Sequence, residues 1–393
     1  MKRSILFLLC AFFAGGLFAQ QKANPNKAYN LYYEKELEQA KEVIDQCVED
    51  PKHNVKASTW LYKGNIDYYL ASKEYDEKQK NDAYVIKYLS APTEAFDAFR
   101  KAEELKSNVE AFDMLTPAEG ISRLYPLLLV EGVEYLIANQ TDKAKNTLEK
   151  AIYSYEIKPP QHPFKGEIYY YYAYTMELIG DKEMAIGNYE KAVMDQSENA
   201  NVYVRLIELL KETGQTNKIG SILAKAKEMA PNNPNVYVTE VDYYWQVDQN
   251  KAEQLLKSLP GFVFTNSDAL ANVANIYIKK EDYDKAEELL NKADRISPNN
   301  FVIIYNLGYC KLKIYDKIFS QANDIYLTQK EEGEKLYALA NKYLNEAQVL
   351  FEQTLQFTPD DLAILKQLRE IYFKNESPKY DEINKKIEQL EKQ

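Results

Sequence analysis

The chain repeats its own residue pattern at a spacing of 34 residues over positions 166–233. When the second half of this stretch is aligned with the first, Gly180 falls on Gly214 and Ala192 falls on Ala226. A period of roughly 20–50 residues is typical of stacked arrays, in which each unit buries its apolar face against the next. The period therefore predicts a repeat array, so a length of 393 residues does not require several separate domains.

Each copy also follows the residue order of a known repeat. In the first copy the small residues Ala173 and Ala185 alternate with large aromatic residues, among them Tyr189. The second copy closes with Pro231. This order resembles the pattern W-x2-L-G-x2-Y, A-x3-F, P of the tetratricopeptide repeat. The resemblance implies an all-α fold, a right-handed superhelical solenoid of antiparallel helix pairs.

The resemblance extends over most of the chain, from Ala57 to Gln393, with two inserts over residues 71–90 and 312–346. In the second insert apolar residues recur every three or four positions, which predicts a long helical hairpin. For the first insert we expect both helices of the unit to lengthen and to project as a hairpin. The segment 267–300 gives the best match, with these residues at the repeat positions: Leu270, Val273, Ala274, Tyr277, Ala286, Leu290, Ala293 and Pro298.

The repeat register also predicts how the chain is divided. We expect one continuous solenoid whose parts follow one another in the sequence. They are a signal peptide (1–19), an N-terminal lead-in and cap helix (20–56), units with the first inserted hairpin (57–158), a proline-rich corner (159–165), regular units (166–300), a unit with the long inserted hairpin (301–360) and a C-terminal capping helix pair (361–393).

Two local signals concern the unit that precedes the corner. Thr116 and Glu119 have the spacing of a capping box, and Pro117 lies in the first turn, so a helix should begin there. We expect Pro126 to bend that helix, because proline offers no backbone N–H and clashes with the preceding turn.

The N-terminus has the features of an export signal. Lys2 and Arg3 precede an apolar run over residues 5–18, and Ala19 stands before Gln20. The run is too short to favour a helix that spans a membrane. The alanine–glutamine junction resembles those of proteins exported by Bacteroidota, which implies cleavage near Ala19. We therefore expect a periplasmic protein, associated with the cell envelope or free in that compartment.

Charge bears on the class of partner. The chain has 60 acidic and 49 basic residues, a net charge of −11 at pH 7. Nucleic acids are bound through their phosphates by basic surfaces, so we expect no nucleic-acid partner. The 33 tyrosines are expected to line helix seams, where the ring packs and the hydroxyl reaches water.

The residue types that catalysis requires are sparse. The two histidines, His53 and His162, lie outside any H-E-x-x-H pattern, and the chain contains no C-x-x-C, phosphate-binding loop or nucleophile elbow. We therefore expect no enzyme activity, no cofactor and no metal. After loss of the signal, Cys47 and Cys310 remain near opposite ends of the predicted stack. A disulfide needs Cα atoms within about 7 Å, so we expect two buried thiols.

The resemblance implies that the first helix of each unit lines a concave groove. Asn275 and Asn306 match two asparagines of family members that grip the acidic C-termini of chaperones. Ala271 and Leu365 stand where those members have a lysine and an arginine, which argues against an acidic ligand. The two amides could instead bind the backbone of an extended peptide, or be ordinary polar residues on a wetted face. The residues expected to face the groove are Tyr170, Tyr174, Asp242, Trp245, Asn275, Tyr305, Asn306 and Tyr309.

These observations lead to two hypotheses of function. The first is a non-enzymatic periplasmic scaffold that binds a protein or peptide segment, basic or extended, through the groove, the hairpins or both. The alternative is a glycan-binding envelope accessory protein, because aromatic faces also stack on sugars. The alternative usually requires a lipid anchor, and Leu9 before Cys10 does not fit a lipoprotein signal. The sequence identifies neither the partner nor the oligomeric state.

Overall fold

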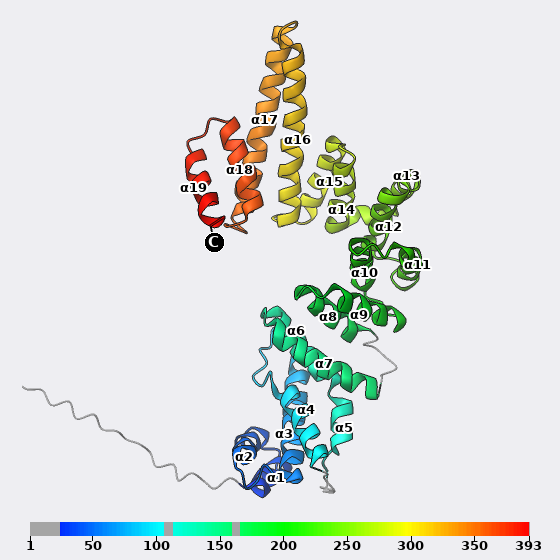
Figure 1. Cartoon of the computed structure of the whole chain (residues 1–393), viewed down its shortest axis with the longest axis vertical. Helices are drawn as coiled ribbons and strands as arrows, with labels where there is room; N and C mark the ends of the chain where they lie inside the picture. Colours follow the sequence, from blue (N-terminus) through cyan, green and yellow to red (C-terminus); the bar gives the residue numbers. More distant parts are fainter. Residues whose placement is uncertain (1–23, 106–112, 159–165, 393) are drawn as a thin grey trace, which may run out of the picture. The chain divides into compact units, whose positions relative to one another are not determined.

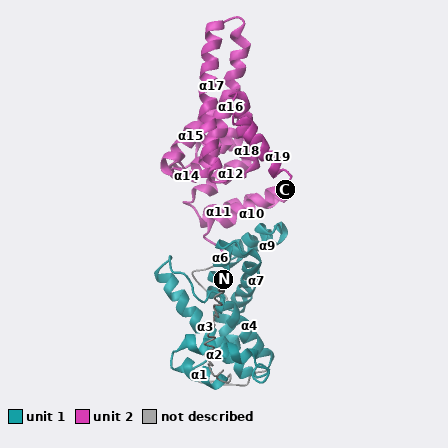
Figure 2. Cartoon of the chain, turned by 90° about the vertical axis from the view of Figure 1, so that its left-hand side faces the viewer, with its two compact units in different colours: residues 1–195 teal, residues 196–393 magenta. Residues whose placement is uncertain are grey.

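The computed structural model describes residues 24–105, 113–158 and 166–392, and the described residues form helices and turns without a strand (Figure 1). The predicted signal peptide and the predicted proline-rich corner lie outside the described residues. The chain forms two compact units, residues 1–195 and 196–393 (Figure 2). The division falls inside the segment 166–300, where the repeat register alone placed no boundary. The predicted all-α class is confirmed.

Unit 1 contains the first nine helices of the described chain, which pack largely against their neighbours in sequence. The segment expected as a lead-in contains a helix of 9 residues followed by one of 13 residues. The helices are α1 (Pro25–Tyr33), α2 (Leu37–Glu49), α3 (Ala57–Lys80), α4 (Ala91–Glu104), α5 (Pro117–Arg123), α6 (Tyr125–Ile137), α7 (Thr141–Ile157), α8 (Glu167–Leu178) and α9 (Lys182–Met194).

The first insert lengthens only one helix, so the expected sharing between two helices is wrong. Helix α3 runs for 24 residues, residues 81–90 are not helical, and α4 begins at Ala91. Pro92 lies in the first turn of α4, where its missing N–H costs nothing, whereas it would break a helix that continued through it. The connecting segment is held instead by Glu74, which accepts a hydrogen bond from the backbone N–H of Lys87 at 2.6 Å.

The capping box is confirmed, but the bend at Pro126 is not. Thr116 Oγ1 accepts from the backbone N–H of Glu119, and the Glu119 side chain accepts from the backbone N–H of Thr116. The helix that starts there ends at Arg123, and Pro126 lies in the first turn of the next helix, α6. Proline thus starts a second helix rather than bending one, in keeping with its preference for first turns.

Unit 2 contains the remaining helices. First helices α10, α12, α14 and α16 pack side by side, and each packs against the helix that follows it. The helices are α10 (Ala200–Glu212), α11 (Ile219–Met229), α12 (Pro234–Val247), α13 (Gln249–Lys257), α14 (Ser267–Lys279), α15 (Tyr283–Ile296), α16 (Phe301–Tyr326), α17 (Lys330–Leu355), α18 (Leu362–Lys374) and α19 (Tyr380–Leu390), with short 3-10 helices at Thr216–Lys218 and Gly261–Thr265.

The second insert forms the long helical hairpin that its periodicity predicts. Helices α16 and α17 have 26 residues each and extend beyond the neighbouring pairs of unit 2 (Figure 1). Ala322 and Ala340 are buried along the seam. At Gly333 a Cβ atom would lie 2.9 Å from the Cα atom of Tyr326, so only glycine lets the two arms approach this closely near the turn.

The glycines that reveal the 34-residue period occupy equivalent turns. Gly180 and Gly214 follow α8 and α10 with φ of 84° and 72°. Glycine adopts this left-handed conformation without steric cost, which lets the chain reverse into the second helix of the pair. Cys47 and Cys310 are both free thiols and both buried, as expected. Among the described residues, no helix has the length and apolar character that crossing a membrane requires.

Candidate functional site

The first helices of unit 2 form a polar cleft of about 250 Å³. Helices α10, α12 and α14 contribute its walls. Two of the predicted groove residues, Asp242 and Asn275, line this cleft. Its residues are Val204, Ile207, Glu208, Lys211, Asn235, Val238, Thr239, Asp242, Asn272, Asn275 and Lys279.

Asp242 links three successive first helices through its carboxylate. Lys211 of α10 donates to Asp242 Oδ2 at 2.5 Å, and Lys279 of α14 donates to Oδ1. Burial opposes the charge of Asp242, but the two lysine hydrogen bonds outweigh it and hold the pKa of the carboxyl below its ordinary value. The charge of Asp242 is therefore already balanced inside the cleft.

Asparagine side chains continue the polar row. Asn306 of α16 donates from Nδ2 to Asn275 Oδ1 of α14 at 2.9 Å. Asn272 and Asn235 form a longer contact of 3.5 Å between α14 and α12. The amide nitrogen of Asn275 and the amide oxygen of Asn306 make no side-chain hydrogen bond to any described residue. The row thus offers the amide NH2 group of Asn275 as a donor and the amide oxygen of Asn306 as an acceptor to a ligand.

Three other predicted groove residues of unit 2 pack on its apolar cores instead of lining this cleft. Trp245 packs on the cluster around α12 and α14, with the Lys280 ammonium 5.1 Å from its ring centroid. Tyr305 lies edge-on to Phe351 with centroids 5.6 Å apart. Tyr309 packs on the same C-terminal cluster as Tyr305. Their role in binding stays a prediction.

Unit 1 contains a second, more apolar cleft of about 480 Å³ between α3, α6 and α8. Of the tyrosines in α8, it is Tyr171 that lines this cleft. Tyr170 packs with ring centroids 5.0 Å from Tyr171 and 6.1 Å from Tyr189, and Tyr174 is 37% exposed. The cleft residues are Tyr75, Lys78, Gln79, Asp82, Pro126, Leu129, Val130, Val133, Glu134, Ile137, Glu167 and Tyr171.

Sequence reasoning missed the floor of this second cleft. Helix α6 has an apolar stripe at intervals of four, three and four residues, formed by Pro126, Val130, Val133 and Ile137. This stripe is separate from the residues that α6 buries in the core. A helix that is apolar on more than one face is a signal of a second contact surface. The repeat pattern identifies only the positions of α6 that pack in the core. It therefore did not predict the second apolar face of this helix.

Unit 1 also contains a buried network of charges. Lys63 lies 2.6 Å from Asp45, 2.8 Å from Asp67 and 2.9 Å from Glu94, and Lys41 lies 3.0 Å from Asp67. Burial opposes the charge of Glu94, but the hydrogen bonds and charges of both lysines lower its pKa to about 2. The three carboxylates are close enough together to bind a metal ion. Two ammonium groups, those of Lys41 and Lys63, already pair with these carboxylates and offset most of their charge. The network thereby joins α2, α3 and α4.

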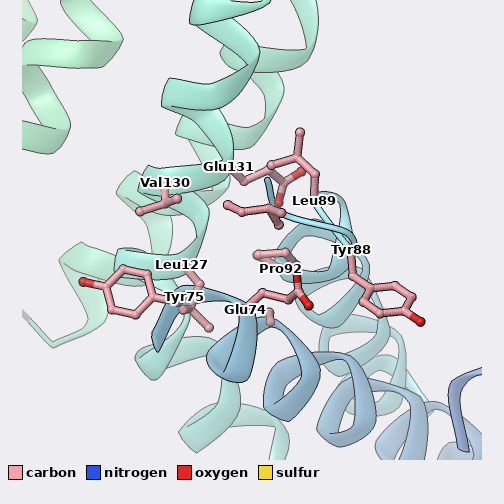
Figure 3. Close-up of a pocket in the computed structure, with 10 residues that line it drawn as sticks. Glu74, Tyr75, Tyr88, Leu89, Pro92, Leu127, Val130 and Glu131 are labelled. Carbon is pink, nitrogen blue, oxygen red and sulfur yellow. The ribbon is translucent and has the colours of Figure 1, made fainter. Parts of the chain in front are cut away.

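A small cavity beside this network is lined by two buried carboxyl groups, Glu74 and Glu131 (Figure 3). Its volume is about 20 Å³, room for about one water molecule. Glu131 Oε2 accepts from the backbone N–H of Thr93 at 2.9 Å and so caps the start of α4 from a neighbouring helix. Burial raises the pKa of Glu131 to about 7, despite its hydrogen bonds from Thr93 and Thr147.

The family comparison matches one helix pair of unit 2. The tetratricopeptide repeat family model covers residues 267–300. These residues form α14 and α15, and they are the segment that the sequence pattern matched best. This segment of the chain is a tetratricopeptide repeat. Stacks of such repeats present extended concave surfaces, which suggests a scaffold for protein interactions.

Curated relatives of the repeat protein have the same kind of repeat. It is 30% identical over 158 residues to interferon-induced protein with tetratricopeptide repeats 2 of Cricetulus griseus, a match over 39% of this chain and 31% of the relative. The Mus musculus protein of that name is 28% identical over 169 residues, 40% of this chain and 35% of the relative. The chain thus spans about a third of the length of these relatives.

Two solved structures are similar over most of the repeat protein. Yeast Tom70 is 15% identical with a TM-score of 0.49, and the match covers 94% of this chain and 85% of Tom70. The human IFIT1 dimer with m7Gppp-AAAA is 17% identical with a TM-score of 0.43, and the match covers 82% of this chain and 72% of that chain.

Proposed function

We propose that this repeat protein is a non-enzymatic scaffold of the periplasm that binds an extended segment of another protein in the cleft of unit 2. The observation that carries the proposal is the pair Asn275 and Asn306, whose amides keep one donor and one acceptor open. The protein-interaction class of the repeat supports a protein as the partner.

The chemistry of the cleft favours recognition of a peptide backbone. Each residue of an extended segment offers one N–H and one C=O, which an asparagine amide can pair with at once. First helices of neighbouring pairs lie roughly 8–10 Å apart, and an extended chain advances about 3.3 Å per residue. One backbone contact on every third residue of the ligand therefore matches the spacing of the helices.

Charge gives little attraction for nucleic acid in this cleft. The human IFIT1 dimer was solved with m7Gppp-AAAA, so RNA is the natural competitor of a protein ligand. Here Lys211 and Lys279 share the carboxylate of Asp242, and Glu208 lines the same cleft, so the two ammonium groups are matched by two carboxylates. The whole chain has a net charge of −11. A phosphate backbone needs unpaired basic groups, which favours the protein ligand.

No observation favours the glycan alternative in the same way. Stacking on sugars requires open aromatic faces. The aromatic residues that were expected to offer such faces in unit 2 pack on the apolar clusters of that unit. They are Trp245, Tyr305 and Tyr309.

The periplasmic location rests on the export features of residues 1–19. We expect the mature protein to begin at Gln20, and mass spectrometry of the protein from fractionated cells measures this. An intact N-terminus in the cytoplasmic fraction would contradict the location without affecting the proposed binding site.

The test of the binding site compares matched asparagines. Once a partner has been crosslinked in cells and identified, Asn275→Ala with Asn306→Ala should weaken its binding by about tenfold or more, as expected from losing roughly two hydrogen bonds. Asn232→Ala, at an exposed turn of the same unit, is the control. Replacing residues 318–337 of the hairpin by a short turn should leave this binding unchanged. Equal binding by the double variant and by the control would contradict the proposed site.

A further inference from the structure

The cleft of unit 1 differs in chemistry from the cleft proposed to bind a partner in unit 2. One wall comes from the extra length of α3, where Tyr75, Lys78 and Gln79 line the cleft, and Asp82 adds to it from the turn that follows. These residues belong to the first insert, which the repeat pattern does not require. The insert therefore gives unit 1 a surface that an ordinary helix pair lacks.

The floor of the cleft is apolar and open to solvent. Pro126, Val130, Val133 and Ile137 form a stripe along α6, and Ile137 at its end is 71% exposed. The rings of Tyr75 and Tyr171 stand on the two neighbouring helices. Aliphatic side chains from a ligand would remove this apolar surface from water, which favours binding.

The charge of the cleft is unbalanced. It contains the carboxylates of Asp82, Glu134 and Glu167 and a single ammonium group, that of Lys78. Lys78 lies 3.0 Å from Glu134 and donates to the backbone carbonyl of Asp82. Glu167 at the start of α8 makes no ion pair with any described residue. Burial raises the pKa of Glu167, and no described basic side chain offsets this effect.

We propose that this cleft is a second partner site, which binds a protein segment carrying an aliphatic side chain for the α6 stripe and a lysine or arginine for Glu167. The cation gains an ion pair in a partly desolvated setting and lies near two aromatic rings, both of which favour it over a neutral group. An acidic segment meets three carboxylates and is repelled. The site is independent of the proposed function of unit 2.

Peptide selection on the whole mature chain tests the proposal. The probe is a phage-displayed library of random 12-residue peptides, and binding of the enriched peptides is then measured with purified protein. We expect enriched peptides to share an aliphatic residue close to a lysine or arginine. Their binding should weaken with added salt, because an ion pair contributes to it.

Matched variants assign the binding to the cleft. Ile137→Ser should weaken it about tenfold, whereas Ile157→Ser, at the exposed end of α7 outside the cleft, should leave it within about twofold. Glu167→Gln should also weaken it about tenfold and reduce its salt dependence. Glu42→Gln on α2, exposed and outside the cleft, should change neither.

Several outcomes would overturn the proposal. They are failure to enrich any peptide, enrichment of peptides without a basic residue, and equal effects of Glu167→Gln and Glu42→Gln. Displacement of the peptides by dodecanoate at concentrations below its micelle range would assign the cleft to lipid chains instead. The double variant Asn275→Ala with Asn306→Ala should leave peptide binding unchanged. Loss of binding in that variant would show that the peptides bind the cleft of unit 2. The two proposed sites can therefore be tested separately.

Discussion

Asn306 donates a hydrogen bond to Asn275 at 2.9 Å and so joins the first helices of two neighbouring repeats, α16 and α14. Each asparagine spends only part of its hydrogen-bonding capacity on the other, and the remaining donor and acceptor stay open. The pair therefore has a structural role and, as proposed, a binding role, which can be measured separately.

The structural role is expected to be small. Asn275→Ala should lower the free energy of unfolding by about 1 kcal/mol, because it removes one half-buried hydrogen bond. Denaturation in urea measures this. A loss of several kcal/mol would mean that the pair is mainly a structural device, and the binding test would then need Asn275→Asp, which keeps an acceptor for Asn306.

Two glycines of unit 1 provide a matched test of close helix packing. A Cβ atom at Gly132 of α6 would lie 2.7 Å from Leu148 of α7, whereas at Gly187 of α9 it would meet no heavy atom within 4 Å. Gly132→Ala should therefore destabilise the protein by about 1–3 kcal/mol through overpacking. Gly187→Ala should stabilise it by about 0.5–1 kcal/mol, because alanine loses less conformational entropy in a helix. Thermal unfolding measures both, and equal effects would contradict the packing.

Glu131 should make stability depend on pH. The pKa of Glu131 in the folded state, about 7, lies above the ordinary value for glutamate. At pH values between these two pKa values, the folded state therefore binds more protons than the unfolded state. The stabilising contribution of the protonated form is complete below the ordinary pKa and is lost as pH rises through about 7. Glu131→Gln should therefore raise the free energy of unfolding at pH 8 by about 1–3 kcal/mol and have little effect at pH 4.

The measurement is chemical denaturation of both proteins at a series of pH values. Glu42→Gln, an exposed residue of the same unit, is the control and should follow the wild type at every pH. A variant that is less stable than the wild type at pH 8 would show that the charged carboxylate is needed to cap α4.

The buried charge network should be sensitive to loss of its central acid. The Asp67 side chain is fully buried and contacts Lys41 and Lys63. Asp67→Ala leaves two buried ammonium groups with less compensation and should cost about 3 kcal/mol of unfolding free energy. Glu77→Ala, which removes an exposed ion pair with Lys80 on the same helix, should change the stability little. If both variants had the same stability, the network would contribute nothing beyond a surface pair.

Sequence reasoning predicted the features that follow from periodicity. The repeat at 267–300 and the long hairpin of α16 and α17 both come from apolar residues at helical spacing, which the structure preserves. It failed where one residue decides the outcome. Pro92 and Pro126 start new helices, but proline position alone did not distinguish a start from a bend.

The phase of α8 could not be read from its residues. Positions 169–172 are all tyrosine, so the helix is aromatic on most of its circumference and composition does not select the cleft face. A shift of one residue turns a side chain by about 100°, so the phase of the helix decides which of the four rings lines the cleft of unit 1, and there it is Tyr171. Packing of α8 against α7 and α9 sets the phase.

Photo-crosslinking in living cells tests the central claim, that the first-helix face of unit 2 binds a protein, most directly. A photoreactive phenylalanine replaces Asn272, exposed in the cleft on α14, and in a second strain it replaces Lys292, exposed on α15 of the same repeat. We expect a defined protein adduct from position 272 and none of that protein from position 292. RNA bound at position 272, or the same adduct from both positions, would contradict the claim.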